Sequence, residues 1–167
     1  QQLTAAIGPL AAAHNPPVVG ITGSAGKTTT TTLVGNMLKE AGFTTWVGGN
    51  IGNPLIEDLP DMQPEHRVVM ELSSFQLETT YSLAPRVAVV LNVSADHMDR
   101  YDGLQDYADT KARVYAQAEF RVFNQDDPLV LAMRQGERQD LFFTLGDPAP
   151  GAFGLRRIDG TPWIAHG

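Results

Sequence analysis

The stretch Thr22-Gly23-Ser24-Ala25-Gly26-Lys27-Thr28 decides the fold class of this chain. It follows the short apolar run Pro17–Thr22, which is typical of a buried strand, and leads into Lys27–Ala41, which we interpret as a helix that ends at Gly42. A glycine-rich turn between a strand and a helix lets backbone N–H groups converge on phosphate oxygens, and the helix N-terminus adds partial positive charge. The sequence therefore predicts a phosphate-binding loop (P-loop) and a bound nucleotide.

Two side chains of this loop have the types that nucleotide chemistry needs. Lys27 would reach the β- and γ-phosphates, and the Thr28 hydroxyl would bind Mg²⁺. The loop is a variant, because the usual signature has a glycine where Ile21 stands. An ordinary glycine turn is the alternative, but a T-G-x-x-G-K-[ST] string arises by chance in a chain of this length in roughly 3 of 10,000 cases. We therefore predict nucleotide contacts at Gly23, Ser24, Ala25, Gly26, Lys27, Thr28 and Thr29.

The composition limits the other function classes. The chain has 167 residues, 43% of them hydrophobic and 19% charged, which predicts one globular domain, or two at most. The net charge of −7 argues against a general nucleic-acid binder and against a protein that binds anionic membranes. The absence of cysteine excludes disulfides, thiolate zinc sites and cysteine nucleophiles, and it suits a reducing cytosol. No apolar run approaches the roughly 20 residues of a membrane-spanning helix.

Beyond the loop, apolar runs alternate with stretches of helical spacing. We expect further strands at Thr44–Val47, Arg67–Leu72, Arg86–Val93, Phe120–Phe123 and Leu141–Thr144, and helices at Leu104–Ala118 and Pro128–Arg134. This rhythm predicts an α/β fold, a mostly parallel sheet flanked by helices. Near the C-terminus, Gly151–Leu155 and Trp163–His166 flank Asp159-Gly160, which is typical of an antiparallel hairpin.

Polar residues follow two of the predicted strands at the ends where α/β proteins bind ligands. Glu71 closes an apolar strand, as does the acid that holds Mg²⁺ in phosphate-loop enzymes; the alternative is an acid satisfied by backbone N–H groups. His97 follows another strand and is flanked by Asp96 and Asp99. This placement supports a second metal or phosphate contact, although a lone histidine is more often structural.

Asn124 follows the strand Phe120–Phe123, and its amide is suited to reading an adenine edge. A turn residue before the next helix is an equally good interpretation. The segment Asn124-Gln125-Asp126-Asp127 also bears on a rival class, the phosphate-loop GTPases, which need N-K-x-D here to bind guanine. Asn124 and Asp127 stand at that spacing, but glutamine stands in place of the lysine, and competition between ATP and GTP would separate the two classes.

Lys111 lies on the apolar side of its predicted helix, three and four residues after Ala108 and Tyr107. Burying a lysine is costly unless it is paired or chemically altered. One interpretation is a lysine whose amine reaches water at the helix end. The other is a lysine that points into the active cleft.

Together these motifs resemble the Mur ligase family over nearly the whole chain. The resemblance rests on TGSAGKTT at Thr22–Thr29, GGNIG at Gly48–Gly52, ELSSFQLE at Glu71–Glu78, NVSADHMDRY at Asn92–Tyr101, and Lys111 within DTKARVY. It implies the P-loop fold of the central ATP-binding domain of these three-domain enzymes, over residues 15–167. The Ala/Leu-rich residues 1–14 would then be a helical lead-in from a preceding domain.

The resemblance also implies roles for individual residues. The implied catalytic residues are Lys27, His97 and Lys111. The implied ligands of Mg²⁺ or Mn²⁺ are Thr28, Glu71, His97 and Lys111, the last as an N-carboxylated lysine. Asn50, Ser73 and Gln76 would line the substrate cleft, and Asn124 would contact adenine.

ELSSFQLE and DHMDR are similar to the strings of the family branch that adds D-glutamate. The implied activity is ATP-dependent ligation of D-glutamate to UDP-N-acetylmuramoyl-L-alanine through an acyl phosphate, by a monomeric bacterial enzyme of the cytoplasm that builds peptidoglycan. Another Mur-type ligase, a folylpolyglutamate synthase, a phosphate-loop kinase or GTPase, and a non-catalytic binding module are the alternatives. Because the flanking domains of such ligases lie outside this sequence, we expect the chain alone to make little or no product.

Overall fold

Eight strands form one sheet in the computed structural model, which describes residues 16–52, 54–136, 138 and 140–167. The predicted lead-in at residues 1–14 lies outside the described residues. The strands are β1 (Val18–Thr22), β2 (Thr45–Gly49), β3 (Arg67–Glu71), β4 (Val87–Val90), β5 (Phe120–Asn124), β6 (Asp140–Phe143), β7 (Ala152–Ile158) and β8 (Thr161–His166). Their order is β2-β3-β1-β4-β5-β6-β7-β8, and every neighbouring pair is parallel except β7 and β8. The predicted mostly parallel sheet is confirmed.

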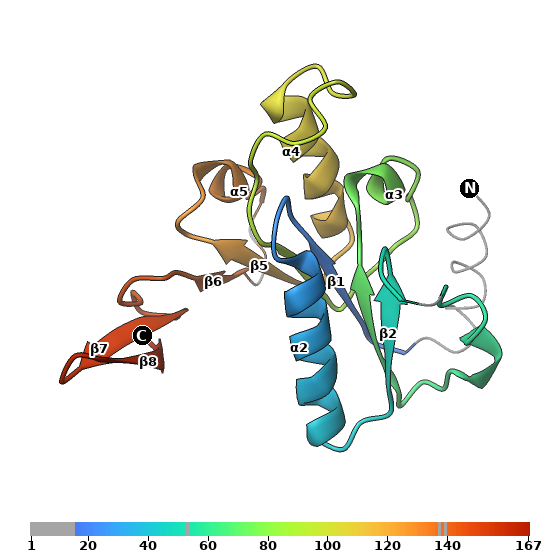
Figure 1. Ribbon diagram of the computed structural model, residues 1–167, viewed down its shortest axis with the longest axis horizontal. Coiled ribbons are helices and arrows are strands. Elements are labelled where there is room, and N and C mark those ends of the chain that lie inside the picture. The colour runs from blue at the N-terminus through green and yellow to red at the C-terminus, as the bar shows by residue number, and fades with distance from the viewer. Residues whose placement is uncertain (1–15, 53, 137, 139) are drawn as a thin grey trace.

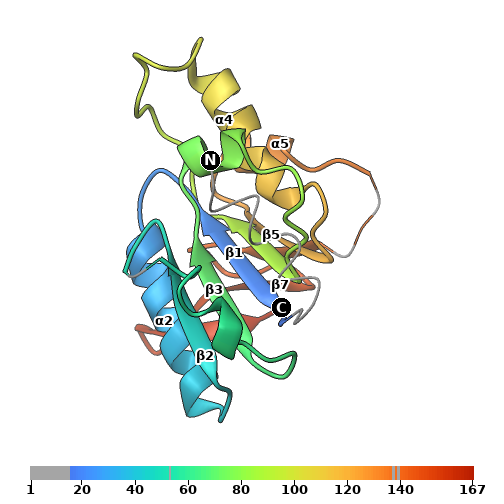
Figure 2. The same cartoon turned by 90° about the vertical axis from the view of Figure 1, so that its right-hand side faces the viewer.

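Helices cover both faces of this sheet. They are α2 (Lys27–Glu40), α3 (Ser74–Glu78), α4 (Leu104–Ala112) and α5 (Pro128–Ala132). Successive residues of a strand point to opposite faces, and β3 shows the division: Val69 packs in the cluster that contains Val34 and Leu38 of α2, whereas Val68 and Met70 pack in the cluster of the other helices. Figures 1 and 2 show α2 on one side of the sheet and α4 and α5 on the other.

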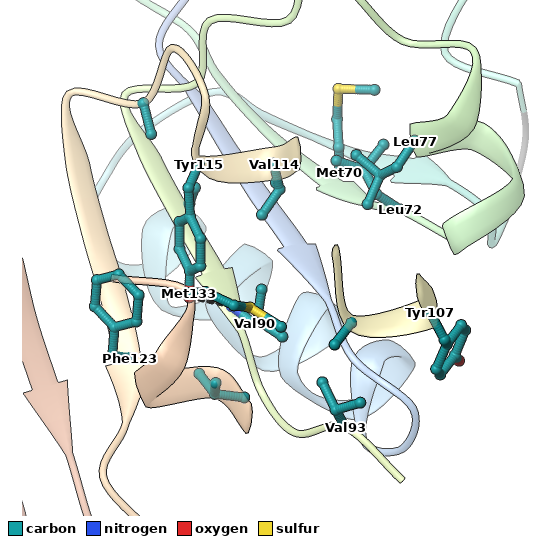
Figure 3. Close-up of a cluster of buried hydrophobic side chains, with 14 of the residues drawn as sticks. Met70, Leu72, Leu77, Val90, Val93, Tyr107, Val114, Tyr115, Phe123 and Met133 are labelled. Carbon is teal, nitrogen blue, oxygen red and sulfur yellow. Dashed lines mark hydrogen bonds between the residues drawn. The ribbon is translucent and has the colours of Figure 1, made fainter. Parts of the chain in front are cut away.

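The larger core lies between the sheet and the three shorter helices (Figure 3). Tyr115 is central to it, because its hydroxyl donates to the Val122 carbonyl at 2.7 Å and accepts from the Val90 N–H at 3.0 Å. Burial raises the pKa of this phenol well above its ordinary value. A buried hydroxyl with both a donor and an acceptor joins strands β4 and β5 to the chain segment that follows α4.

The helix predicted over Leu104–Ala118 is shorter than expected. Helix α4 ends at Ala112, and the 3₁₀ turn Arg113–Tyr115 follows it. The β-branched and aromatic side chains of this turn have low helix propensity and are buried in the core instead. The one-turn helix α3, which we did not predict, begins with a capping box in which Ser73 and Gln76 each bond the other's backbone N–H.

The C-terminal hairpin is confirmed, with longer strands than predicted. Asp159 and Gly160 have φ values of 51° and 79°, so both occupy the left-handed region that a two-residue type I′ turn requires. Ile158 pairs with Thr161 next to the turn, and the pairing extends to Phe153 and His166. Within the described part of the chain, no helix has the length and apolar character needed to cross a membrane.

Candidate nucleotide-binding site

The phosphate-binding loop connects β1 to α2, as the sequence predicts. Gly26, the residue before the helix, has φ = 81°, a conformation that strongly favours glycine. The first N–H groups of α2, at Lys27, Thr28 and Thr29, have no partner within the helix, because no preceding helical turn offers them a carbonyl. No side chain caps this helix end either. The loop therefore presents unpaired N–H groups together with the positive end of a 14-residue helix.

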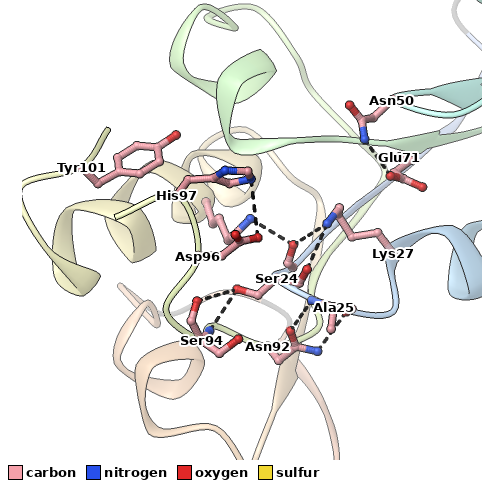
Figure 4. A network of polar contacts seen from close by, with 12 residues as sticks. Ser24, Ala25, Lys27, Asn50, Glu71, Asn92, Ser94, Asp96, His97 and Tyr101 are labelled. Atoms are coloured by element: carbon pink, nitrogen blue, oxygen red, sulfur yellow. Dashed lines mark hydrogen bonds and ion pairs between the residues drawn. The ribbon is translucent and has the colours of Figure 1, made fainter. Parts of the chain in front are cut away.

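Glu71 is buried directly beside this loop. The residue is only 1% exposed. One carboxylate oxygen accepts a hydrogen bond from the Thr28 hydroxyl at 2.8 Å, and the other accepts one from the Asn50 amide at 3.0 Å. Figure 4 shows Asn50 and Glu71 side by side. Thus the first turn of helix α2, the start of the loop after β2 and the end of β3 meet at one carboxylate, although they are separated in sequence.

Gly49 makes this meeting sterically feasible. It has φ = 110°, and a Cβ atom at this position would overlap the carbonyl oxygen of Glu71. Without a side chain, the backbone approaches closely enough for the Asn50 N–H to donate to the Glu71 carbonyl at 2.9 Å. The close approach of the backbone to Glu71 thus explains why the second residue of the GGNIG string is glycine.

Lys27 and Lys111 converge on one backbone carbonyl. Each ammonium donates to the Gly23 carbonyl oxygen at 3.0 Å, and Lys27 also donates to the Ser24 carbonyl at 3.2 Å. Lys111 is 1% exposed, and its Nζ lies 4.4 Å from the centroid of the Tyr107 ring. A lysine that reaches water at the helix end is therefore excluded.

The surroundings of Lys111 oppose its positive charge. Burial is the largest cause, followed by repulsion from the Lys27 ammonium, and together they lower the pKa of Lys111 to about 8, against a weaker opposite effect of Asp96. An amine with this pKa has an appreciable neutral, nucleophilic fraction at neutral pH. Lys111 is thus suited to chemistry that an ordinary surface lysine performs poorly.

His97 lies farther out. Its side chain is 46% exposed, and its Nε2 lies 3.5 Å from Asp96 Oδ2. Its ring packs against that of Phe75, with the ring centroids 4.9 Å apart and the planes tilted by 52°. Its backbone has φ = 56°, which is uncommon for a residue other than glycine. Among the residues that the structure describes, no group of three or more His, Cys, Asp or Glu side chains is placed to hold a metal ion. Thr28 and Glu71 are in contact, and the wider metal-binding set with His97 and Lys111 stays a prediction.

The predicted adenine and substrate residues make contacts within the chain. Asn124 donates to the Leu91 carbonyl at 2.8 Å and accepts from the Asp126 N–H at 2.9 Å. The second bond is typical of a turn residue, the alternative that we gave for Asn124. Ser73 and Gln76 bond each other in the capping box of α3. Contacts of these three residues with adenine or substrate stay predictions.

Sequence reasoning assigned no role to Asn92 or Ser94, yet both contact the phosphate loop. The Asn92 amide pairs with the backbone of Ala25, and the Ser94 backbone pairs with the Ser24 hydroxyl (Figure 4). Neither residue belongs to a periodic pattern. Both lie within the string NVSADHMDRY that carried the family resemblance, but their contacts with the loop depend on β4 lying next to β1 in the sheet.

Comparison with known proteins agrees with this fold. Residues 21–154 match the Mur ligase middle domain, and the chain therefore belongs to the Mur ligase family. It is 48% identical over 130 residues to the UDP-N-acetylmuramoylalanine–D-glutamate ligase of Pelotomaculum thermopropionicum and 49% identical over 151 residues to that of Methylobacillus flagellatus. These alignments cover 76% and 90% of this chain but only 29% and 33% of the relatives. The chain thus spans about a third of their length.

Solved structures of other Mur ligases share the fold. MurF from Acinetobacter baumannii superposes with a TM-score of 0.74 at 23% identity, over 94% of this chain and 37% of that one. The MurF ligase from Thermotoga maritima in complex with ADP also has a TM-score of 0.74, at 24% identity, over 98% of this chain and 40% of that one. At such identities the likeness concerns the fold alone. The predicted P-loop fold of Mur ligase central domains is confirmed.

Proposed function

We propose that this chain is the ATP-binding central domain of a ligase that joins D-glutamate to UDP-N-acetylmuramoyl-L-alanine. The observation that carries the proposal is the pairing of Thr28 with the buried Glu71 beside a phosphate loop that Lys27 and Lys111 both contact. The relatives at 48% and 49% identity that carry this name support the choice of acceptor. ATP, UDP-N-acetylmuramoyl-L-alanine and D-glutamate are the ligands of the whole enzyme in this proposal, and the bacterial cytoplasm is its location.

The residues present fit a magnesium ion. Mg²⁺ prefers hard oxygen ligands and is commonly held by one or two carboxylates together with substrate phosphates. Thr28 and Glu71 supply a hydroxyl and a carboxylate that already lie 2.8 Å apart. When bound, the ion would neutralise charge on the β- and γ-phosphates. Thr28 and Glu71 would hold it, and Mn²⁺ would suit the same ligands.

The chain's own groups would act mainly through position and charge. In the proposed reaction a substrate carboxylate oxygen attacks the γ-phosphorus of ATP, and the bond to the β-phosphate oxygen breaks, giving an acyl phosphate and ADP. The D-glutamate amine then attacks the acyl carbon, inorganic phosphate leaves, and the amine loses a proton. Lys27 would stabilise the charge that spreads over the transferred phosphoryl group, and the loop N–H groups would orient it.

Lys111 would act as a carbamate in this proposal. Its neutral amine adds to CO₂, forming an N–C bond and releasing a proton, and the product is an anion with two hard oxygen atoms. The pKa of about 8 supports the required neutral fraction, and the nearby Lys27 would stabilise the new negative charge. The test is an NMR spectrum of the chain in isotope-labelled bicarbonate: a carbamate signal is expected in wild type and absent in Lys111→Met, and its absence from wild type contradicts the modification.

The nucleotide proposal is tested by calorimetry with Mg²⁺ and ATP, ADP or GTP. We expect binding that prefers adenine nucleotides and is lost in Lys27→Ala, with Lys39→Ala on the same helix as a matched control that leaves affinity unchanged. A preference for GTP would contradict the ligase proposal and favour a phosphate-loop GTPase. ADP release by the isolated chain that depends on D-glutamate would contradict the expectation that the other domains of the relatives are required.

A further inference from the structure

The segment that follows β4 forms a strap along the phosphate loop, and we define this strap as Leu91–Ser94. The parallel pairing of β1 with β4 continues past the strand ends, because the Leu91 N–H donates to the Thr22 carbonyl at 2.9 Å and the Ser24 N–H donates to the Asn92 carbonyl at 3.0 Å. The loop is therefore bonded to the strap along its first residues.

Asn92 makes the most specific contact of the strap. Its Oδ1 accepts from the Ala25 N–H at 2.8 Å, and its Nδ2 donates to the Ala25 carbonyl at 3.0 Å. One carboxamide thus satisfies both backbone groups of one loop residue, which a hydroxyl or carboxylate side chain could not do with the same geometry. Ala25 has no side-chain polar atom that could compete for these bonds.

The strap is itself held from behind. Asp127, the residue that caps α5, accepts the Val93 N–H on its Oδ2 at 2.7 Å and the Leu129 N–H on its Oδ1 at 3.0 Å. The Asn124 amide holds the Leu91 carbonyl at 2.8 Å. These bonds hold the strap to β5 and to the N-terminus of α5. Asn92 is therefore held in place independently of the loop, and its hydrogen bonds restrict the movement of the loop.

These bonds divide the N–H groups of the loop into two sets. Those of Ser24 and Ala25 are bonded to Asn92, whereas no hydrogen bond among the described residues uses those of Gly26 to Thr29. An anion that lies at the helix N-terminus would therefore meet only the second set. The Ala25 carbonyl and the Gly26 N–H belong to one planar peptide unit, so fixing that carbonyl also fixes the direction of the Gly26 N–H, from which helix α2 continues.

We propose that Asn92 is a positioning residue for the nucleotide: its carboxamide commits the Ala25 peptide before binding and aligns the N–H groups of Gly26 to Thr29 towards the phosphates. This inference rests on the proposed nucleotide site. It assigns Asn92 no contact with the nucleotide itself. Preorganisation of this kind improves affinity because the loop loses less conformational freedom when the ligand binds.

The test compares Asn92→Leu, which keeps the size of the side chain and removes both bonds, with Asn36→Leu, a matched change at an exposed asparagine of α2. We expect amide hydrogen exchange at Ala25 to be at least about 10-fold faster in Asn92→Leu, and its affinity for Mg-ADP to be at least about 10-fold weaker, from the loss of two hydrogen bonds. Asn36→Leu should change neither quantity. Thermal unfolding without nucleotide verifies that both variants fold.

Asn92→Asp separates positioning from a general structural role. It keeps the acceptor for the Ala25 N–H but loses the donor to the Ala25 carbonyl, so exchange at Ala25 should lie between that of wild type and that of Asn92→Leu, and the affinity for Mg-ADP should fall in the same order. Wild-type affinity for Mg-ADP in Asn92→Leu, or unchanged exchange at Ala25, would overturn the inference. If wild type binds no nucleotide, the proposed function fails for this chain, and the exchange comparison alone then decides whether Asn92 fixes the loop.

Discussion

Lys111 and Gly23 lie 88 positions apart in the chain and are joined by a hydrogen bond of 3.0 Å from the lysine Nζ to the glycine carbonyl oxygen. The bond connects helix α4 with the phosphate loop and places a buried cation next to Lys27. Two ammonium groups on one carbonyl repel each other, and this repulsion adds to burial in lowering the pKa of Lys111. An anionic ligand at this place would relieve the repulsion.

Replacing Lys111 by methionine should therefore stabilise the unliganded, unmodified chain. The folded pKa of about 8 lies below the ordinary 10.5, so burial of the charged form opposes folding at neutral pH. We expect Lys111→Met to raise the free energy of unfolding at pH 7 by up to about 3 kcal/mol. Between pH 8 and 10.5 the unfolded wild-type chain binds more protons than the folded one, so the free energy of unfolding of wild type should increase as the pH rises through this range. The difference in stability between Lys111→Met and wild type should therefore shrink.

This prediction is checked by denaturant unfolding over a pH series in buffer free of CO₂. Lys39→Met is the control, because Lys39 is exposed on the last turn of α2. A Lys111→Met variant that is less stable than wild type at pH 7 would show that the hydrogen bond to Gly23 and the contact with Tyr107 outweigh the cost of burying the charge.

Glu71→Gln should separate metal binding from nucleotide binding. The substitution keeps the shape of the side chain but removes the negative charge that would hold Mg²⁺ beside Thr28. We expect affinity for ADP with Mg²⁺ to fall at least about 10-fold, since a hydrogen-bonded charge is lost, while affinity for ADP with a metal chelator stays the same or rises. Glu40→Gln, at the far end of α2, is the control. Equal losses with and without metal would argue for a purely structural Glu71.

The sequence was sufficient to predict the parts of this site that follow periodic or motif rules. The phosphate loop lies between a strand and a helix as expected, and Glu71 ends its strand. Lys111 lies on the buried side of α4 because its spacing from Ala108 and Tyr107 matches the helical period. In each of these cases a pattern within a few residues of the chain was enough to place the residue in the fold.

Other features depended on contacts that no local pattern encodes. The strap residue Asn92 touches Ala25 only because β4 lies next to β1, and strand order does not follow from the apolar runs. The one-turn helix α3 is too short for a periodic signal. Its capping box, Ser73 with Gln76 three residues later, was nevertheless a visible start signal that we did not use.

The contact between Glu78 and the segment after β4 should give acid-sensitive stability. Hydrogen bonds from Arg100 and then from Tyr101 lower the pKa of Glu78 below its ordinary 4.5. The ionised form therefore stabilises the fold fully above pH 4.5, and this stabilisation is lost as the pH falls through the lowered pKa. We expect Glu78→Gln to be less stable than wild type by about 1 kcal/mol or less at pH 7, because the pair is partly exposed.

Chemical unfolding of wild type and Glu78→Gln between pH 3 and 7 measures this difference. The two curves should converge at the acid end of the series. Glu57→Gln, at an exposed residue, serves as the control and should follow wild type throughout. A constant difference between wild type and Glu78→Gln over the whole range would mean that the carboxylate charge contributes nothing.

Gly49→Ala and Gly42→Ala form a matched pair that measures the close approach of Gly49 to Glu71. Both glycines have positive φ, 110° and 89°, but a Cβ atom at position 42 meets nothing within 4 Å, whereas one at position 49 overlaps the Glu71 carbonyl. Gly42→Ala should therefore cost about 1 kcal/mol from backbone strain alone, and Gly49→Ala about 3 kcal/mol or more. Because the displaced carbonyl belongs to Glu71, Gly49→Ala should also weaken Mg²⁺-dependent nucleotide affinity, and Gly42→Ala should not. Denaturant unfolding and calorimetry on the same samples give both quantities, and equal effects of the two substitutions would show that the backbone at Glu71 adapts without cost.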